Sequence, residues 1–265
     1  MNRKKFNSKV DRLLQRIPPL GKLLTTLFSA QEVLMLEIFR FLDQKFHVNS
    51  LIFLDKYLFK GRWGGKIVPL NINLQPDMSF LPSQEILELL SRSSVTGISY
   101  CYCRNVQRKH GKPNCDHPIN TCIHLGFGKD LKEIPFKSEN LKKVSKEEIR
   151  KILIESDERG LIHQLIYYPS PDFYYVACNC CPCCCVVLSK FLKMGAPQVI
   201  KSDFIAETDL SKCANCGNCV QWCYFGARKM NNGRLALTPS LCFGCGICIS
   251  KCPNRAISLK KKLKN

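Results

Sequence analysis

Acidic residues are scarce in this chain of 265 residues: 21 Asp and Glu stand against 40 Lys and Arg, and the formal net charge is +19 at pH 7. No apolar run is suited to span a bilayer, because the longest, 20–46, is interrupted by six charged side chains. The basic start of the chain lacks a continuous apolar core and a small-residue cleavage site, so no secretory signal is visible. These absences predict a protein of the reducing cytoplasm, where thiols persist.

Common catalytic fingerprints are also missing. The chain contains no dinucleotide-binding glycine pattern, no Ser/His/Asp arrangement and no paired carboxylates that indicate acid–base catalysis. Gly61, Gly64 and Gly65 predict a turn, because their spacing does not match a phosphate-binding loop. The sequence therefore identifies no catalytic residue, and it leaves open whether the protein is an enzyme.

Cysteine is abundant instead, with 18 residues, and eight of them form two copies of the spacing C-x2-C-x2-C-x3-C, 29 residues apart. This thiolate run holds [4Fe–4S] clusters: the first three cysteines bind one cluster and the fourth binds the partner cluster. Zinc sites use pairs of CxxC instead of overlapping runs of four. The expected ligand sets are Cys213, Cys216, Cys219 and Cys252 for cluster 1, and Cys242, Cys245, Cys248 and Cys223 for cluster 2.

From about 200 to 259 the chain resembles a bacterial-type two-cluster [4Fe–4S] ferredoxin domain. Gly217 and Gly246 each follow a second cysteine, where a missing Cβ lets backbone amides approach cluster sulfurs. The resemblance implies short pairing strands at Val199–Glu207 and Ala256–Leu259. Tyr224 departs from it, because proline is common at that position and the second copy keeps Pro253.

Ten cysteines lie outside the repeat, in two groups. Soft thiolate ligands so close in sequence can enclose a metal centre, so a third iron–sulfur cluster or a zinc ion is expected in this middle region. The alternatives are a redox-active dithiol, or cysteines that bind nothing. His117 and His124 are spare ligands beside the first group. The two groups are Cys101, Cys103, Cys115 and Cys122, and then Cys178, Cys180, Cys181, Cys183, Cys184 and Cys185.

These cysteine strings, together with 160–163 before the second group, resemble a family of poorly characterised, cysteine-rich 4Fe-4S-binding proteins of anaerobic bacteria and archaea. In that family a module of this kind precedes a two-cluster ferredoxin domain. The resemblance covers about 66–260 and implies clusters without a defined reaction.

The predicted fold class is α+β in four parts. A mainly helical region at 1–95 precedes a cysteine-rich α/β region at 96–198, a two-cluster ferredoxin-type domain with short antiparallel strands at 199–260, and a basic tail at 261–265. In the middle region, 98–103 alternates like a strand, and 173–177 reads as another. Ser145 and Glu148 form a capping box for a helix that ends near Gly160, and 186–195 predicts a second helix.

The predicted function is electron transfer: single electrons pass through two [4Fe–4S] clusters, with a further cluster in the middle region. The alternative is an oxidoreductase, or a subunit of one, with a catalytic or substrate-binding centre at Cys178–Cys185. The basic charge predicts an acidic redox partner protein or a peripheral membrane contact. Nucleic acid is disfavoured, because no recognition motif is present.

Overall fold

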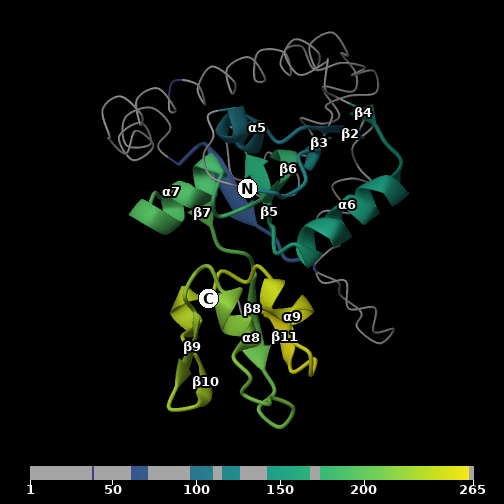
Figure 1. Ribbon diagram of the computed structural model, residues 1–265. Helices are drawn as coiled ribbons and strands as arrows, with labels where there is room; N and C mark the ends of the chain where they lie inside the picture. The colour runs from purple at the N-terminus through teal and green to yellow at the C-terminus, as the bar shows by residue number, and fades with distance from the viewer. Residues whose placement is uncertain are drawn as a thin grey trace, which may run out of the picture.

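The computed structural model describes Ile38 and residues 61–70, 96–109, 115–125, 142–167 and 174–262. Most of the helical region predicted at 1–95 lies outside these residues. The described part is mixed α and β, and it divides into a sheet domain and a C-terminal domain that is built around the cysteine repeat (Figure 1).

The sheet domain is built on seven strands in the order β4-β2-β3-β6-β5-β1-β7. Neighbouring strands run antiparallel except β1 and β7, which run parallel. Strand β5, next to the middle strand β6, is buried along its whole length, so both faces of the sheet are covered there. The strands are β1 Gly64–Ile67, β2 Thr96–Ser99, β3 Cys122–Leu125, β4 Lys142–Lys143, β5 Ile162–Tyr167, β6 Tyr174–Cys180 and β7 Val199–Ile200.

Three helices belong to this sheet: α5 (Tyr102–Lys109), α6 (Lys146–Glu158) and α7 (Val186–Met194). The capping box of α6 is confirmed, since the Glu148 amide donates to Ser145 Oγ at 3.2 Å and the Ser145 amide donates to Glu148 Oε2 at 2.8 Å. Apolar residues of α6 then pack in one core with the strands. Gly195 ends α7 with φ at 69°, as a C-terminal glycine is expected to do.

Two segments differ from the sequence-based prediction. Gly64 and Gly65, expected in a turn within the mainly helical region, begin a strand, Gly64–Ile67, which lies in the sheet between β5 and β7. The sheet domain therefore reaches back past residue 96. The strand expected over 98–103 ends at Ser99, and Cys103 lies on α5. The helical turn carries Arg104 into the interior, where its guanidinium donates to Thr121 Oγ1 and to the carbonyl of Asn179.

The C-terminal domain pairs its first and last strands, β8 (Phe204–Thr208) and β11 (Ile257–Lys261), in antiparallel register. The hairpin of β9 (Arg228–Asn231) and β10 (Arg234–Leu237) lies between them in sequence and turns at Asn232-Gly233, both with positive φ. The short helical segments of the C-terminal domain are α8 Asn218–Gln221, η3 Pro239–Leu241 and α9 Ile247–Ser250.

The single opening strand expected over Val199–Glu207 is divided. Val199–Ile200 pairs with β1 in the large sheet, and the chain then bends before β8 begins at Phe204. Ser202 fixes the bend, because its amide donates to the carbonyl of Phe243 and its hydroxyl to that of Gly244. The boundary between the domains therefore lies at 201–203. At the other end, β11 extends to Lys261, into the stretch expected to be a tail.

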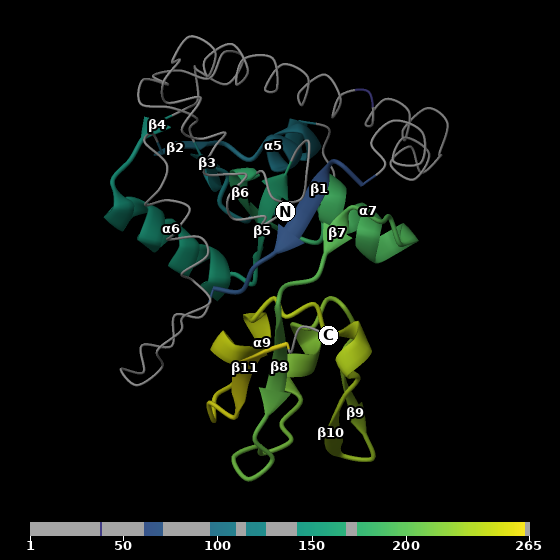
Figure 2. The same ribbon diagram turned by 180° about the vertical axis from the view of Figure 1, so that it is seen from behind.

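The two domains share one hydrophobic core, and Figure 2 shows β7 leading directly into β8 at their junction. The Phe225 ring stacks on Phe243 with centroids 4.2 Å apart, and Phe191 of α7 packs against Phe243 at 4.9 Å. A second contact lies at the end of α6, where a Cβ on Gly160 would fall 2.3 Å from the Trp222 ring. The C-terminal domain is thus packed against the sheet domain from two sides.

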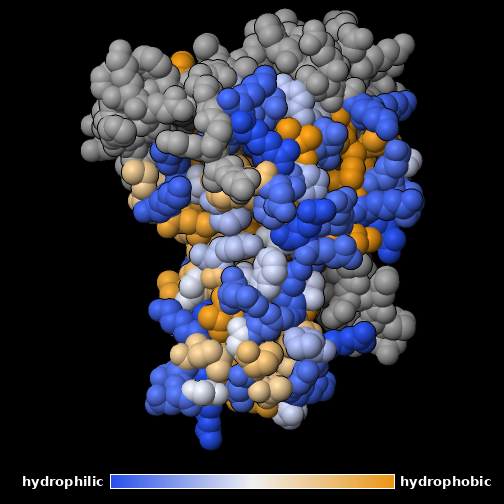
Figure 3. Space-filling model, in the orientation of Figure 1, coloured by the Kyte–Doolittle hydropathy of each residue, from blue (hydrophilic) through white to orange (hydrophobic). Residues whose placement is uncertain are grey.

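Hydrophilic side chains cover much of the described surface in Figure 3, as the composition leads one to expect. Within the described part of the chain, no helix has the length and apolar character that crossing a membrane requires.

Candidate functional site

The backbone conformation follows the same 29-residue repeat as the cysteines. Left-handed residues fall at matching positions in both copies: Asn215 and Gly244, Gly217 and Gly246, and Gly226 and Arg255. Matching turn hydrogen bonds follow, such as Val220 amide to Gly217 carbonyl and Ile249 amide to Gly246 carbonyl, both at 2.9 Å. The two copies therefore wrap the chain around their cysteines in the same way.

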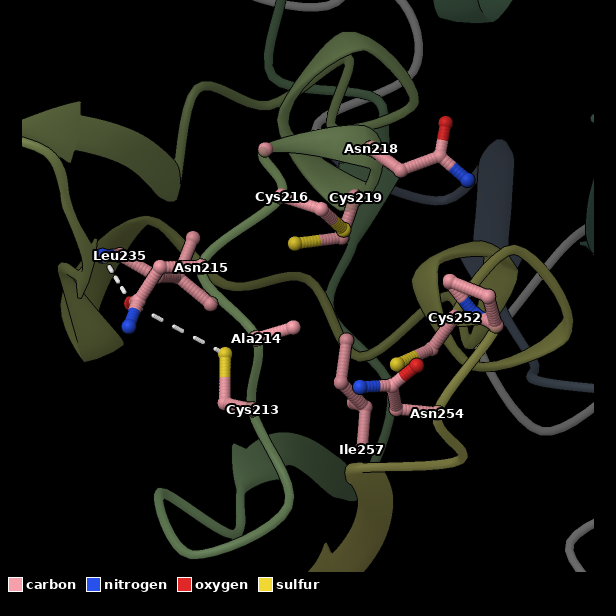
Figure 4. A pocket seen from close by; sticks show the side chains of 12 residues that line it. Cys213, Ala214, Asn215, Cys216, Asn218, Cys219, Leu235, Cys252, Asn254 and Ile257 are labelled. Carbon is pink, nitrogen blue, oxygen red and sulfur yellow. Dashed lines mark hydrogen bonds between the residues drawn. The ribbon is translucent and has the colours of Figure 1, made fainter.

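The first three cysteines of the first copy and Cys252 of the second lie around one hollow (Figure 4). The hollow is partly open to solvent, and Leu235 and Ile257 lie in its wall. Asn215 holds the loop in place, because its side-chain oxygen accepts a hydrogen bond from the Leu235 amide at 2.9 Å. Four sulfurs around an apolar hollow fit a cubane cluster, and these are the four residues expected for cluster 1.

The other four repeat cysteines also gather. Burial raises the pKa of the Cys245 thiol well above its usual range, and the neighbouring thiols of Cys248, Cys223 and Cys242 add to the effect. The structure therefore brings Cys223 of the first copy to the three cysteines of the second. These are the residues expected for cluster 2, and Cys245 packs in the core shared with the sheet domain.

A buried arginine, which sequence reasoning missed, lies between these two sets. Arg228 donates to Thr208 Oγ1 at 2.7 Å and to the Ala206 carbonyl at 3.2 Å. Burial opposes its charge, but the thiols of Cys248 and Cys219 outweigh burial and raise the pKa of the guanidinium. A fixed cation at this position stabilises negative charge on both cysteine sets.

The ten middle cysteines divide in space differently from their order in the chain. Cys115 lies with three cysteines of the second group, and the four Sγ atoms lie within 4.8 Å of one another. We call this set, Cys115, Cys181, Cys183 and Cys184, the four-cysteine site.

The spacing of the four-cysteine site fits a single metal ion. A tetrahedral ion with bonds of about 2.3 Å to sulfur holds its ligands about 3.8 Å apart. The Cys115 and Cys181 sulfurs lie 4.0 Å apart, and those of Cys183 and Cys184 lie 3.7 Å apart. A cubane binds its thiolates on four separate irons and spreads them farther. The site can therefore close on zinc or iron with little rearrangement.

The other six middle cysteines form a separate group beside α5, β3 and β6, and we call it the six-cysteine ring: Cys101, Cys103, Cys122, Cys178, Cys180 and Cys185. The two spare histidines join neither group. His124 Nε2 lies 2.7 Å from Ser99 Oγ, and His117 is absent from the metal-binding groups of the described residues.

Tyr224, the departure from the ferredoxin pattern, lies at the junction of the domains. Burial raises the pKa of its hydroxyl to about 12, and the thiols of Cys245, Cys183 and Cys181 add to the effect. The Tyr224 side chain packs in the same core as Cys245, where the thiols of Cys183 and Cys181 also act on it.

Comparison with known proteins gives a match for the C-terminal domain. Residues 212–257 match the model of the 4Fe-4S dicluster domain. The chain therefore contains a 4Fe-4S iron–sulfur domain over these residues. No solved structure matches the chain with significance.

Curated relatives match over the same part of the chain. The archaeal-type glutamate synthase [NADPH] of Thermotoga maritima is 34% identical over 68 residues, which are 25% of this chain and 13% of that protein. The pyruvate synthase subunit PorD of Methanocaldococcus jannaschii is 39% identical over 51 residues, 19% of this chain and 59% of that subunit. PorD of Methanothermobacter marburgensis is 33% identical over 54 residues, 20% of this chain and 63% of that subunit. The chain thus spans less than two thirds of each relative, one of which is named as a synthase and two as a synthase subunit.

Proposed function

We propose that this chain is an electron-transfer protein that passes single electrons through two [4Fe–4S] clusters and holds a further metal centre in its sheet domain. The repeat supports the proposal most strongly, because sequence spacing, backbone turns and the exchange of the fourth cysteines all agree. A bound [4Fe–4S] cluster supplies one-electron redox chemistry. The protein residues hold the clusters, exclude water and set the charge around them.

Arg228 has a defined role in this proposal. Reduction of a cluster held by these cysteines would add one negative charge to a buried site, where an unpaired charge is costly. The guanidinium contacts Cys219 of one set and Cys248 of the other, so it favours the reduced state of both. We expect it to raise both reduction potentials.

The two cluster sites differ in exposure to solvent. This difference gives the electron path an outer end and an inner end. Cys216 is exposed, whereas Cys245 packs in the core shared with the sheet domain. A redox partner can approach the Cys216 side, and Tyr224 bridges the inner side to the four-cysteine site. We infer that this site holds the further metal centre and that the inner cluster faces it.

The partner is inferred from charge and from the relatives. A chain with a net charge of +19 steers towards an acidic surface. Pyruvate synthase subunit PorD is named as a subunit, which supports a role in delivering electrons to an enzyme. The second candidate function is an oxidoreductase whose own catalytic centre lies in Cys178–Cys185. The density of thiols in the sheet domain supports this alternative.

Iron and sulfide analysis of chains purified without oxygen tests the cluster assignment. We expect Cys213→Ser and Cys252→Ser each to remove about four irons, and the double variant to remove no more, because both residues serve one cluster. The matched control, Cys213→Ser with Cys242→Ser, should remove about eight. If the two double variants lost equal amounts of iron, this would contradict the assignment of each fourth cysteine to the cluster of the other copy.

A further inference from the structure

The six-cysteine ring is a closed circuit of sulfur contacts. Each thiol interacts with two others, in the order Cys101, Cys103, Cys185, Cys180, Cys178, Cys122 and back to Cys101. The packing agrees, because Cys103 and Cys178 pack against the core of Cys101 and Cys122, and Cys178 also packs against the core of Cys180 and Cys185. The Cys122 and Cys178 sulfurs lie 3.9 Å apart. This is close to the separation of two thiolates on one metal ion, which is about 3.8 Å.

Separate elements bring these cysteines together. Cys178 and Cys180 alternate with Asn179 along β6, so both point to one face of the sheet. Cys122 begins β3, the neighbour of β6, and Cys185 is the N-cap residue of α7. Four of the six are buried, and Cys103 and Cys178 are half-buried. A core built for packing alone would gain more from larger apolar side chains than from six thiols.

A buried cation lies against the ring. The Arg104 side chain is fully buried, and its guanidinium donates to neutral groups, at 3.2 Å to Thr121 Oγ1 and at 3.0 Å to the Asn179 carbonyl. Among the described residues, no carboxylate forms an ion pair with it. The thiols of Cys101, Cys180 and Cys181 are the neighbours that can carry negative charge. A buried guanidinium needs an anion, and cysteines supply one when they bind metal as thiolates.

The C-terminal domain also contains a buried arginine that lies among cysteines. Arg228 is likewise buried, and it is held by a threonine hydroxyl and a strand carbonyl between two cysteine sets. Arg104 lies in this way between the ring, through Cys101, and the four-cysteine site, through Cys181. The parallel indicates two thiolate centres in the sheet domain as well, separated by one arginine.

We propose that the six-cysteine ring binds a polynuclear iron–sulfur centre with at least two metal ions, distinct from the four-cysteine site. One tetrahedral ion holds four thiolates about 3.8 Å apart. No three of the six ring sulfurs, all of which the structure describes, lie within 4.8 Å of one another, so the ring is too open for one ion and fits thiolates that are spread over several irons. Cys180 and Cys185 also share a core with Cys245 of the inner ferredoxin site, so the two iron–sulfur sites would adjoin. The inference deepens the proposed function, since it assigns a second centre to the same domain.

The test counts metals on the intact, anaerobically purified chain by native mass spectrometry, with total iron, zinc and sulfide measured in parallel. We expect the wild-type chain to carry at least two irons beyond the roughly eight of the ferredoxin domain. Cys178→Ser should lose these irons and keep the eight, whereas the matched variant Cys183→Ser should lose only the metal of the four-cysteine site. Cys178 and Cys183 are both half-buried, so we expect the two substitutions to disturb folding to a similar degree.

Three outcomes would overturn the proposal. The first is a wild-type chain with no iron beyond the ferredoxin domain, a count that requires no variant and so is independent of folding. The second is loss of zinc without loss of iron in Cys178→Ser. The third is loss of the same metal in Cys178→Ser and Cys183→Ser, which would mean one shared centre. A wild-type chain that carries the extra irons but lacks the roughly eight of the ferredoxin domain would refute the proposed function alone.

Discussion

Gly160 offers a sharp test of the junction between the two domains. Its φ of +72° disfavours any side chain, and a Cβ would lie 2.3 Å from Trp222 Cζ3 and 3.0 Å from the Tyr224 hydroxyl. In Gly160→Ala the left-handed backbone costs about 1–2 kcal/mol. The Trp222 ring must also retreat by more than about 1 Å to restore ordinary contact, and overpacking of this kind costs about 1–3 kcal/mol.

Gly195→Ala is the matched control, because Gly195 has a φ of +69° and no atom within 4 Å of the Cβ position. We expect Gly160→Ala to unfold at a temperature lower than the control by about 3–9 °C, at about 3 °C per kcal/mol. Thermal unfolding followed by circular dichroism under anaerobic conditions measures the difference. In a Trp222→Ala background the difference between the two alanine variants should vanish. Equal transitions in the original background would refute the predicted overlap.

Three further predictions concern other contacts. Ser145→Ala should destabilise α6 by about 1 kcal/mol because the capping box is lost, whereas Ser145→Asp should restore most of this in the same thermal assay. Arg228→Gln should lower the reduction potentials of the two clusters in an anaerobic redox titration, because it removes the buried cation; unchanged potentials would contradict its role. Replacing Lys260 and Lys261 with Gln should slow reduction by an acidic partner at low salt, and the effect should disappear at high salt. An unchanged rate at low salt would exclude steering by these lysines.

The sequence was most informative where a local pattern determines local structure. The spacing of the repeat predicted both cysteine sets that the structure brings together, because ligands three residues apart need a tight loop whatever surrounds it. The capping box at Ser145 and the glycine after α7 were also readable, since both act within one turn of a helix. Such signals need no knowledge of the rest of the fold.

The sheet domain was harder to predict because its sites depend on contacts distant in sequence. Cys115 and Cys181 lie 66 residues apart along the chain, and only the folded sheet places their sulfurs 4.0 Å apart. Alternation over 98–103 indicated a strand, but the burial of Arg104 favours a helix that starts at Tyr102. Neighbours in the string Cys178–Cys185 likewise separate into two sites, because adjacent side chains on β6 and in the following turn point in different directions.

Arg104 and Arg228 are both buried cations, so each needs negative charge nearby. Each lies among cysteines without a carboxylate partner in the described residues, and each contacts members of two different sets. Apolar burial would select against such a cation unless permanent negative charge faced it. Metal-bound thiolates provide that charge at neutral pH, whereas protonated thiols do not. The positions of Arg104 and Arg228 therefore favour thiolate centres in both domains.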